Sequence, residues 1–449
     1  MNNTIYAPIT AKGKSSVYTI RISGPNTLSC LEILKIKKSL KHRQATLCQI
    51  FEPNTNNLID EALVVFFKAP NSFTGEDVCE ISLHASNYVI KKFFEILSSI
   101  SDLRFAKPGE FSQRAFLNGK VSLTQAEGIA DLVASETEIQ QKQALRELEG
   151  KTGKIYDKWR EKILSVSSLL EACIDFPEDG LSEKSLILEI EKKIQNLKQE
   201  ISKTLKDEKV GEKIREGLFI AIAGNPNVGK STLINTLINR EIAIVSHIPG
   251  TTRDVIETSL DLDGILAIIA DTAGIRDSKN SIEKEGIKRA LSKFKNADIK
   301  LLILTPNIKL NSQLKENTNK DTLIVLNKID TISKSELNIL IKKLEKEYSS
   351  TIIPISLKNK TGINKLIKIL VEKAQEIISP NSSTIITRER HRVELKNTLK
   401  YLKAFSVLDN IELAAENLRL AANAIGKITG KIRVDDILEQ IFSKFCIGK

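Results

Sequence analysis

Hydrophobic and polar positions follow one pattern in the first part of the chain and another in the next. Up to about residue 118, short apolar runs such as Val17–Ile22 and Val78–Leu83 are typical of strands, and Tyr88–Leu97 has the spacing of an amphipathic helix. From Leu123 to about Thr204 the spacing is helical. We therefore expect an α+β region followed by a helical region.

The middle of the chain has a third pattern. Between Leu218 and about Ile378, strand-like apolar runs alternate with helical segments, which is typical of a doubly wound α/β domain with a mostly parallel sheet. Arg388 to Gln440 is helical again, after a linker at Ser379–Ser383. Because helical segments lie on both sides of the α/β block, we predict that this block is inserted into a helical domain whose two halves pair in space.

These patterns predict a multidomain protein with four segments. Residues 1–118 form the α+β domain, and residues 119–212 form the first part of an all-α helical domain. Residues 213–378 form the inserted α/β domain, and residues 379–449 form the second part of the helical domain with a Cys-Ile-Gly-Lys tail.

A glycine-rich segment, Gly224–Ser231, lies at a predicted strand-to-helix turn. Its sequence is Gly-Asn-Pro-Asn-Val-Gly-Lys-Ser, between the apolar run Leu218–Ala223 and the helical run Thr232–Leu237. Such a loop points backbone N–H groups at phosphate oxygens, while Lys230 neutralises phosphate charge and the Ser231 hydroxyl can bind Mg²⁺. The segment is therefore a predicted P-loop. Its expected nucleotide contacts are Asn227, Val228, Gly229, Lys230, Ser231 and Thr232.

Two further motifs follow predicted strands. Asp271-Thr272-Ala273-Gly274 ends an apolar run, where a carboxylate can hold Mg²⁺ through water and a glycine N–H can meet a γ-phosphate. Asn327-Lys328-Ile329-Asp330 follows another apolar run. A carboxylate there can accept hydrogen bonds from the ring N–H and the exocyclic amine of guanine, which adenine does not offer together. Asp330 therefore predicts GTP as the ligand, with Lys328 packing over the base and Asn327 bracing the loop.

Two loops complete the predicted nucleotide site. Ser356-Leu357-Lys358 is expected on the base side, with leucine where alanine is usual. A threonine between the P-loop and Asp271 is expected as the second Mg²⁺ ligand; Thr252 is preferred and Thr251 is the alternative. Further nucleotide contacts are expected from the same loop, at Ser246, His247, Ile248, Pro249, Gly250, Thr251 and Thr252.

One residue expected in many GTPases is missing. Ile275 stands where signalling GTPases place the glutamine that orients the attacking water, and its side chain cannot form hydrogen bonds. Another group must therefore assist hydrolysis.

Composition narrows the class of protein. The chain has 449 residues, of which 41% are hydrophobic and 27% charged, and it lacks both a long apolar run and a signal-peptide pattern, so we expect a cytoplasmic protein. Five cysteines without metal-type spacing are expected to be reduced thiols. The net charge of +11 is compatible with an RNA partner, but abundant Lys, Asn and Ile also suggest compositional drift, so charge alone does not decide.

Four nucleotide motifs carry a family resemblance: Gly224–Ser231, Pro249-Gly-Thr-Thr-Arg-Asp254, Asp271–Gly274 and Asn327–Asp330. They resemble the motifs of the bacterial Era-like GTPases. With four further segments, they resemble the MnmE (TrmE) family of tRNA-modification GTPases over essentially the whole length. His84-Ala85-Ser86, where relatives usually have His-Gly-Gly, and Leu357 are departures from the family pattern. The further segments are Pro70–Asp77, Pro108–Lys120, Ala172–Pro177 and Phe445–Lys449.

The resemblance implies K⁺-dependent GTP hydrolysis. In this family a K⁺ ion binds beside the β- and γ-phosphates, and the GTPase (G) domains dimerise when it binds. Glu283 would act on the attacking nucleophile through a water molecule, and the P-loop residue Lys230 would also be catalytic. The implied K⁺ ligands are Asn227, Ser246, the Ile248 carbonyl and Thr251.

The resemblance also implies a folate site in the N-terminal domain, which dimerises in this family. A 5,10-methylene- or 5-formyl-tetrahydrofolate would bind there, its pterin donating to Glu80. Arg21, Lys120 and Lys449 match the other folate contacts, and Cys446 matches a cysteine needed for modification. An inert thiol is the alternative for Cys446.

The implied activity is part of tRNA modification. A homodimer would act with the FAD-dependent protein MnmG, in a heterotetramer or larger complex, to add an aminomethyl or carboxymethylaminomethyl group at C5 of the wobble uridine of certain tRNAs. The alternative is a GTP-switched ribosome-assembly factor like other Era-like proteins.

Overall fold

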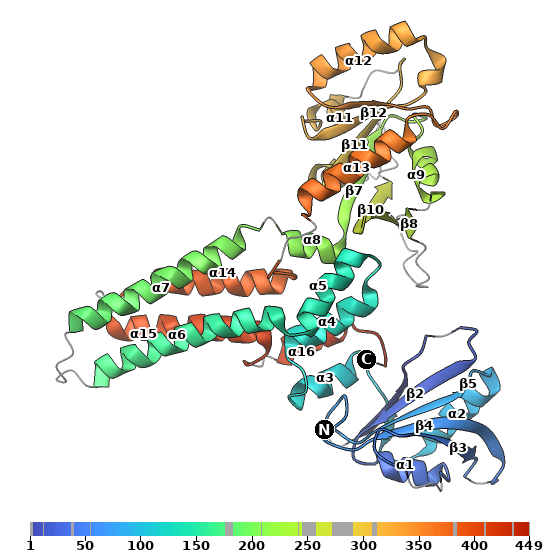
Figure 1. The fold of residues 1–449 in the computed structure, drawn as a ribbon, viewed down its shortest axis with the longest axis vertical. Coiled ribbons are helices and arrows are strands. Elements are labelled where there is room, and N and C mark those ends of the chain that lie inside the picture. The colour runs from blue at the N-terminus through green and yellow to red at the C-terminus, as the bar shows by residue number, and fades with distance from the viewer. Residues whose placement is uncertain are drawn as a thin grey trace, which may run out of the picture. The chain divides into compact units, whose positions relative to one another are not determined.

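The computed structural model divides into two compact units. Unit 1 contains Met1–Ala130, Arg146–Leu197 and Asn397–Lys449, and unit 2 contains Asp131–Leu145 and Lys198–Lys396 (Figure 1). The structure describes residues 3–11, 13–36, 40–53, 55–175, 183–207, 209–240, 242–244, 257–271, 291–307, 312–379, 384–407, 410–432 and 435–448.

Unit 1 begins with a six-stranded sheet in the order β3-β4-β5-β2-β1-β6. All neighbouring pairs are antiparallel except β1 with β6. Buried side chains alternate with partly exposed ones along β5, and the buried ones pack with α1 and α2 in one core. The strands are β1 (Thr4–Pro8), β2 (Val17–Ser23), β3 (Ala45–Phe51), β4 (Leu58–Phe67), β5 (Val78–His84) and β6 (Leu103–Phe105), and the helices are α1 (Thr27–Ile33) and α2 (Asn87–Ser99).

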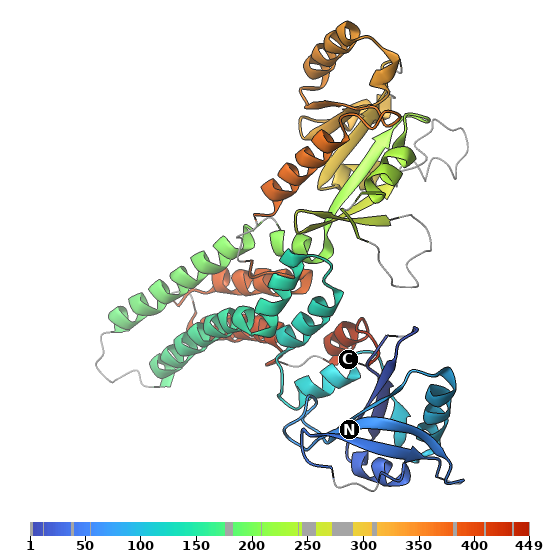
Figure 2. The same ribbon diagram turned by 45° about the vertical axis from the view of Figure 1, so that its right-hand side comes forward.

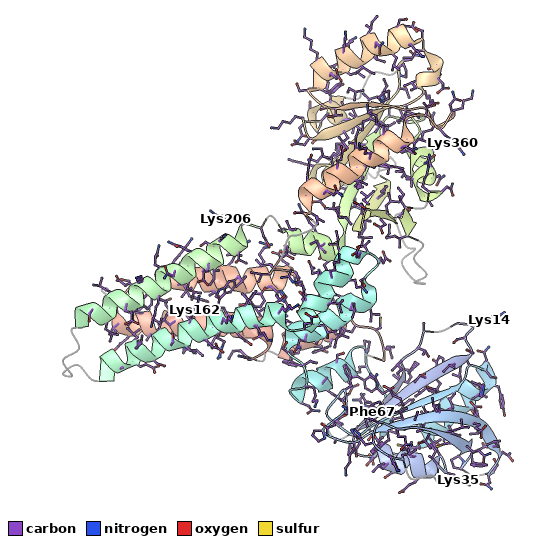
Figure 3. The ribbon with its side chains drawn as sticks, in the orientation of Figure 1. Lys14, Lys35, Phe67, Lys162, Lys206 and Lys360 are labelled. Carbon is purple, nitrogen blue, oxygen red and sulfur yellow. The ribbon has the colours of Figure 1, made fainter. Side chains whose placement is uncertain are left out.

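Helices follow the sheet, as the hydrophobic spacing predicts. The long helix α6 packs along α15, so the helical segments before and after the α/β block do pair in space (Figures 1 and 2). Lys162 lies on the exposed side of α6 (Figure 3). The helices are α3 (Glu110–Leu117), α4 (Leu123–Ala134), α5 (Glu138–Leu148), α6 (Lys151–Asp175), α7 (Glu183–Leu205), α14 (Glu389–Ala404), α15 (Ile411–Thr429) and α16 (Asp435–Phe442).

Unit 2 contains a seven-stranded sheet in the order β13-β12-β11-β7-β10-β9-β8. The pairs from β13 to β10 are parallel, while β9 and β8 are antiparallel additions. The strands are β7 (Leu218–Gly224), β8 (Ala243–Ile244), β9 (Glu257–Leu262), β10 (Ile265–Asp271), β11 (Ile299–Leu304), β12 (Thr322–Leu326) and β13 (Ile352–Pro354). The predicted doubly wound, mostly parallel sheet is confirmed.

Helices cover both faces of this sheet. One apolar cluster joins Ile220 and Ile222 to the α9 and α13 side, and another joins Ala221 and Ala223 to the α12 side. Both faces of β7 are therefore buried, which explains its continuous apolar sequence. The helices and the 3₁₀ turn described between residues 210 and 377 are α8 (Val210–Glu216), α9 (Lys230–Ile238), α11 (Ser312–Glu316), η1 (Ile329–Thr331), α12 (Lys334–Tyr348) and α13 (Ile363–Ile377).

The strand order places β7 at the point where the chain changes direction across the sheet. Its neighbours β10 and β11 lie on opposite sides of it. Ligands of open α/β sheets bind at the carboxyl ends of the strands at such a switch point. The predicted P-loop follows β7 directly.

Three cysteines that are scattered in the sequence lie together in the structure. Cys30, Cys48 and Cys79 are buried in one core of unit 1, and burial raises the pKa of the Cys30 thiol to about 11. These three and Cys446 are free thiols.

Among the described residues, no group of three His, Cys, Asp or Glu is placed to hold a metal ion, and no described helix is both long and apolar enough to span a bilayer.

Candidate functional site

The P-loop is shaped by two glycines that cannot carry a side chain. A Cβ atom on Gly224 would lie 2.5 Å from the carbonyl oxygen of Ile303, and one on Gly229, where φ is +104°, would lie 2.5 Å from Nδ2 of Asn327. The backbone therefore approaches strand β11 and the loop after β12 more closely than any other residue would permit. Helix α9 starts at Lys230, so its positive end and open N–H groups face the loop.

Lys230 lies against this loop. Its Nζ donates hydrogen bonds to the carbonyl oxygens of Gly224, at 2.9 Å, and Asn225, at 3.0 Å. An ammonium held beside a glycine turn at a helix N-terminus fits a polyphosphate, because all three features favour negative charge.

Asn327 ties the base-side loops to the P-loop. This side chain is 2% exposed; its Nδ2 donates to the Val228 carbonyl at 2.8 Å, and its Oδ1 accepts from the Leu357 N–H at 3.2 Å. Nζ of Lys328 donates to the Asn227 carbonyl at 3.0 Å. Three loops separated in sequence are therefore joined through one buried amide, in the geometry that a bracing residue requires.

Asp330 is positioned by a buried serine. Oγ of Ser356, which is 1% exposed, donates to Oδ1 of Asp330 at 2.5 Å. That hydrogen bond lowers the pKa of the Asp330 carboxyl, and the charges of Lys358 and Lys328 lower it further. The carboxylate is consequently ionised at neutral pH and exposed at the edge of the site, as an acceptor for two guanine donors must be.

Leu357, the departure from the usual alanine, also contacts the P-loop. Its Cδ1 lies 3.2 Å from the position that a Cβ of Gly229 would take, and the side chain is partly buried against the sheet core. It thus adds an apolar contact between the base-side loop and the P-loop.

Part of the predicted nucleotide site lies outside the described residues. Asp271 ends β10, and its backbone pairs in register with Ile222 of β7 beside the P-loop. Of the predicted metal ligands, only Asn227 and Ser231 are described, and both are exposed on the P-loop. The predicted residues outside the description are Ser246, His247, Ile248, Pro249, Gly250, Thr251, Thr252, Thr272, Ala273, Gly274 and Glu283.

Asn227 and Ser231 fit the predicted metals in their chemistry. Asn227 has φ of +61°, a conformation that few residues other than glycine and asparagine adopt. Its amide oxygen and the Ser231 hydroxyl are hard oxygen donors, the type that Mg²⁺ and K⁺ prefer.

A second group of predicted site residues lies on the sheet of unit 1. Arg21 Nε donates to Oε1 of Glu80 at 2.9 Å, so the predicted pterin acceptor already has a cationic partner. The Arg21 guanidinium also lies 5.2 Å from the ring centre of Phe73 and 5.5 Å from that of Phe111. Lys120, by contrast, donates to the Pro70 carbonyl at 2.8 Å.

The sequence reasoning missed a buried ion-pair network beside this group. Arg114, 1% exposed, donates to both carboxylate oxygens of Glu76, at 3.1 and 3.0 Å, and to Glu110 at 3.1 Å. Burial would raise the pKa of Glu110, but hydrogen bonds from Arg104, from the Lys107 N–H and from Arg114 outweigh it and lower the pKa to about 2. The two motifs Pro70–Asp77 and Pro108–Lys120 are therefore structural partners. The i, i+4 spacing of Glu110 and Arg114 is the sequence signal for one pair of this network.

The C-terminal tail packs against the same part of unit 1. The Phe442 and Phe445 rings contact each other, and the Gly109 N–H donates to the Cys446 carbonyl at 3.3 Å. A Cβ on Gly448 would lie 2.1 Å from the Pro8 carbonyl oxygen, so the tail lies tightly on the end of β1. Cys446 is an exposed free thiol there, and Lys449 lies outside the described residues.

Two family models match this chain. Residues 123–446 match the MnmE helical domain, and residues 4–120 match the GTP-binding protein TrmE N-terminus. Among solved structures, the G domain of the T. maritima FeoB iron transporter is 25% identical, with a TM-score of 0.28, and covers 35% of this chain and 99% of that one.

Curated relatives match over the full length. The tRNA modification GTPase MnmE of Wolbachia pipientis subsp. Culex pipiens is 46% identical over 100% of this chain and 99% of that protein. The protein of the same name from Rickettsia akari is 44% identical over 99% of this chain and 100% of its own length. The chain therefore belongs to the MnmE family of tRNA modification GTPases.

Proposed function

We propose that this protein is a K⁺-dependent GTP hydrolase that acts with MnmG to install an aminomethyl or carboxymethylaminomethyl group at C5 of the wobble uridine of certain tRNAs. The observation that supports it most is the single site in which Asn327 and Lys328 reach the P-loop while Ser356 orients Asp330. The names of the full-length relatives support the tRNA substrate.

Different residues of the site are proposed to bind the base, the phosphates and the Mg²⁺ ion of GTP. The ionised Asp330 selects guanine, because adenine would leave its carboxylate facing no pair of donors. Lys230 and the N-terminus of α9 hold the β- and γ-phosphates, and Ser231 is the proposed Mg²⁺ ligand with Thr252. Glu283 is proposed to orient the attacking water.

Asn227 is the described member of the proposed K⁺ site, with Ser246, Ile248 and Thr251 as the other ligands. A bound K⁺ supplies positive charge near the β- and γ-phosphates, where charge develops during phosphoryl transfer. Ile275 cannot supply a hydrogen bond to water, so some such group is needed.

The unit 1 group is the proposed one-carbon site. Glu80 is positioned by Arg21 to accept hydrogen bonds from a pterin, and the Phe73 and Phe111 rings flank that pair. Lys120 and Lys449 are proposed contacts to the rest of a tetrahydrofolate. Cys446 belongs to the C-terminal tail, which packs on the same unit, and its thiol is exposed. This thiol is proposed to take part in the modification.

We further propose a cytoplasmic homodimer, joined through the N-terminal domains, whose G domains associate during the GTP cycle. The four predicted segments, 1–118, 119–212, 213–378 and 379–449, stay part of this proposal. The alternative, an Era-like ribosome-assembly factor, is not favoured because relatives matching the entire chain have tRNA modification in their names.

The cation proposal is tested by measuring GTP turnover in KCl and in NaCl. Wild-type protein should turn over GTP at least about tenfold faster in K⁺, and Asn227→Ala should lose most of this difference. Asn338→Ala, which alters an exposed asparagine of α12, serves as the matched control and should behave as wild type. Equal turnover in both salts, or full K⁺ activation of Asn227→Ala, would contradict the proposal.

A further inference from the structure

Three exposed cations of unit 1 lie beside the loop that follows β4. Lys68 begins this loop, and Lys41 and Arg43 belong to the segment just before β3. The Arg43 N–H donates to the Phe66 carbonyl at 2.8 Å, and the Lys68 N–H donates to Nδ1 of His42 at 3.0 Å. These hydrogen bonds hold the segment 41–43 against the end of β4.

A fourth cation reaches the same loop from the end of α3. Nζ of Lys120 donates to the Pro70 carbonyl at 2.8 Å, and Nη2 of Arg43 donates to the Asn71 carbonyl at 3.2 Å. Pro70 and Asn71 are consecutive, so the ammonium and the guanidinium bind adjacent carbonyl groups. The Lys120 stem lies over Gly75, since its Cδ is 3.3 Å from the position that a Cβ there would take. We call these four cations the basic cluster: Lys41, Arg43, Lys68 and Lys120.

The described carboxylates do not neutralise the basic cluster. All four side chains are exposed, and none forms an ion pair with a described Asp or Glu. Asp77 contacts the loop, but its Oδ1 accepts from the Ala69 N–H at 2.8 Å and so holds the backbone. The hydrogen bonds from Lys120 and Arg43 to carbonyl groups use single N–H donors and leave both positive charges in place. Such a surface attracts a flexible polyanion.

Strand β4 connects the basic cluster to the proposed pterin acceptor. Glu80 of β5 pairs with Val65 of β4, so these two side chains lie on the same face of the sheet. Lys68 follows Val65 by three residues, which is about 10 Å at the rise of a strand. Phe67, labelled in Figure 3, is partly exposed and lies on the face of Glu80 before Lys68. A ligand whose pterin meets Glu80 can therefore extend over Phe67 and carry its acidic end to the basic cluster.

We infer that the basic cluster binds the γ-linked polyglutamate tail of a tetrahydrofolate, so that the protein prefers polyglutamylated folates to the monoglutamate. Each added glutamate brings one more carboxylate on a flexible chain, which complements several exposed cations at once. The tail is continuous with the ligand proposed at Glu80, which favours it over an RNA backbone as the polyanion at this position. This inference rests on the one-carbon site of the proposed function.

Isothermal titration calorimetry of the full-length protein tests the inference, with 5-formyl-tetrahydrofolate that carries one glutamate or five. At about 50 mM NaCl, wild type should bind the pentaglutamate at least about tenfold more tightly. The triple variant Lys41→Gln, Arg43→Gln and Lys68→Gln should reduce this preference to below about threefold, while its affinity for the monoglutamate stays within about twofold of wild type. At about 0.5 M NaCl the wild-type preference should shrink at least about threefold, a measurement that needs no substitution.

A second triple variant, Lys14→Gln, Lys35→Gln and Lys91→Gln, is the matched control. It removes the same net charge from exposed lysines of unit 1, and Figure 3 labels Lys14 and Lys35 away from Phe67. It should keep the full preference for the pentaglutamate.

Three results would overturn the inference: equal binding of both folates by wild type, a full preference in the first triple variant, or an equal loss in the control. If the first triple variant kept the preference but lost affinity for tRNA, the basic cluster would serve RNA, which also overturns the inference. A wild-type protein that binds neither folate would contradict the proposed one-carbon site instead.

Discussion

At the scale of single residues, the proposed guanine specificity depends on one carboxylate, that of Asp330. Asp330→Asn replaces one acceptor oxygen by an N–H₂ group, which cannot accept a hydrogen bond from guanine. An amide, with one acceptor and one donor, instead matches the N–H and C=O groups of xanthine. We expect the affinity for GTP to fall about 100-fold or more and the affinity for xanthosine triphosphate to rise. Competition binding with both nucleotides measures this change.

Asp321→Asn is the control for that substitution, since Asp321 is an exposed aspartate just before β12. It should leave both affinities unchanged. If Asp330→Asn still preferred GTP over xanthosine triphosphate, Asp330 would not be the residue that recognises the base.

A second residue-scale prediction concerns acid stability. The pKa of Glu110 lies at about 2 in the folded protein, below the ordinary value of 4.5, so its ionised form stabilises the fold above about pH 4.5. This contribution is lost as the pH falls through the folded pKa. Glu110→Gln should therefore lower the free energy of unfolding at pH 7 by about 3 kcal/mol, seen as a lower urea midpoint, and the two proteins should converge towards pH 2.

Glu138→Gln provides the comparison, because Glu138 pairs with Lys142 on an exposed helix surface. It should not shift the midpoint at pH 7. A constant gap between Glu110→Gln and wild type from pH 7 to pH 2 would show that ionisation of Glu110 is not what stabilises the network.

At the scale of elements, the junction of α8 and α14 depends on a buried arginine. Arg392 donates to both oxygens of Glu212, at 2.8 and 2.6 Å, and to Asp207 at 2.7 Å, and all three side chains are largely buried. Arg392→Met would leave two buried carboxylates without their cation. We expect a loss of about 3–5 kcal/mol in the free energy of unfolding, measured by urea denaturation.

The exposed pair Arg419–Glu416 supplies the matched substitution, Arg419→Met, which should leave the midpoint unchanged. The double variant Arg392→Met with Glu212→Met should recover part of the loss. A midpoint equal to wild type in Arg392→Met would mean that this cluster does not stabilise the junction.

Elements could be predicted from sequence where local pattern and local packing agree. β7 is a continuous apolar run because both of its faces are buried, and α2 has the helical spacing of a helix with one buried face. The P-loop could be predicted because it lies at a strand-to-helix boundary, between β7 and α9. Arg114 with Glu76 and Arg392 with Glu212 were not predictable, since their partners are 38 and 180 residues away. The grouping of α5 with the unit 2 sheet was likewise not predictable. It depends on a contact between Ile139 and Gly264, in the turn between β9 and β10, which is far from α5 in the sequence.

At the scale of the whole molecule, the account links a guanine-nucleotide site in unit 2 to a one-carbon site in unit 1 within one modification reaction. Relatives matching the full length are named as tRNA modification GTPases, which supports a tRNA product for the family. Neither site alone performs the proposed reaction. The account therefore requires that loss of GTP chemistry abolishes the nucleoside product.

Mass analysis of tRNA nucleosides from a deletion strain tests this requirement most directly. The account predicts that C5 aminomethyl-type wobble uridines disappear on deletion, return with the wild-type chain, and do not return with Lys230→Ala, which removes the ammonium from the P-loop. Unchanged wobble uridines in the deletion strain, or full restoration by Lys230→Ala, would contradict it.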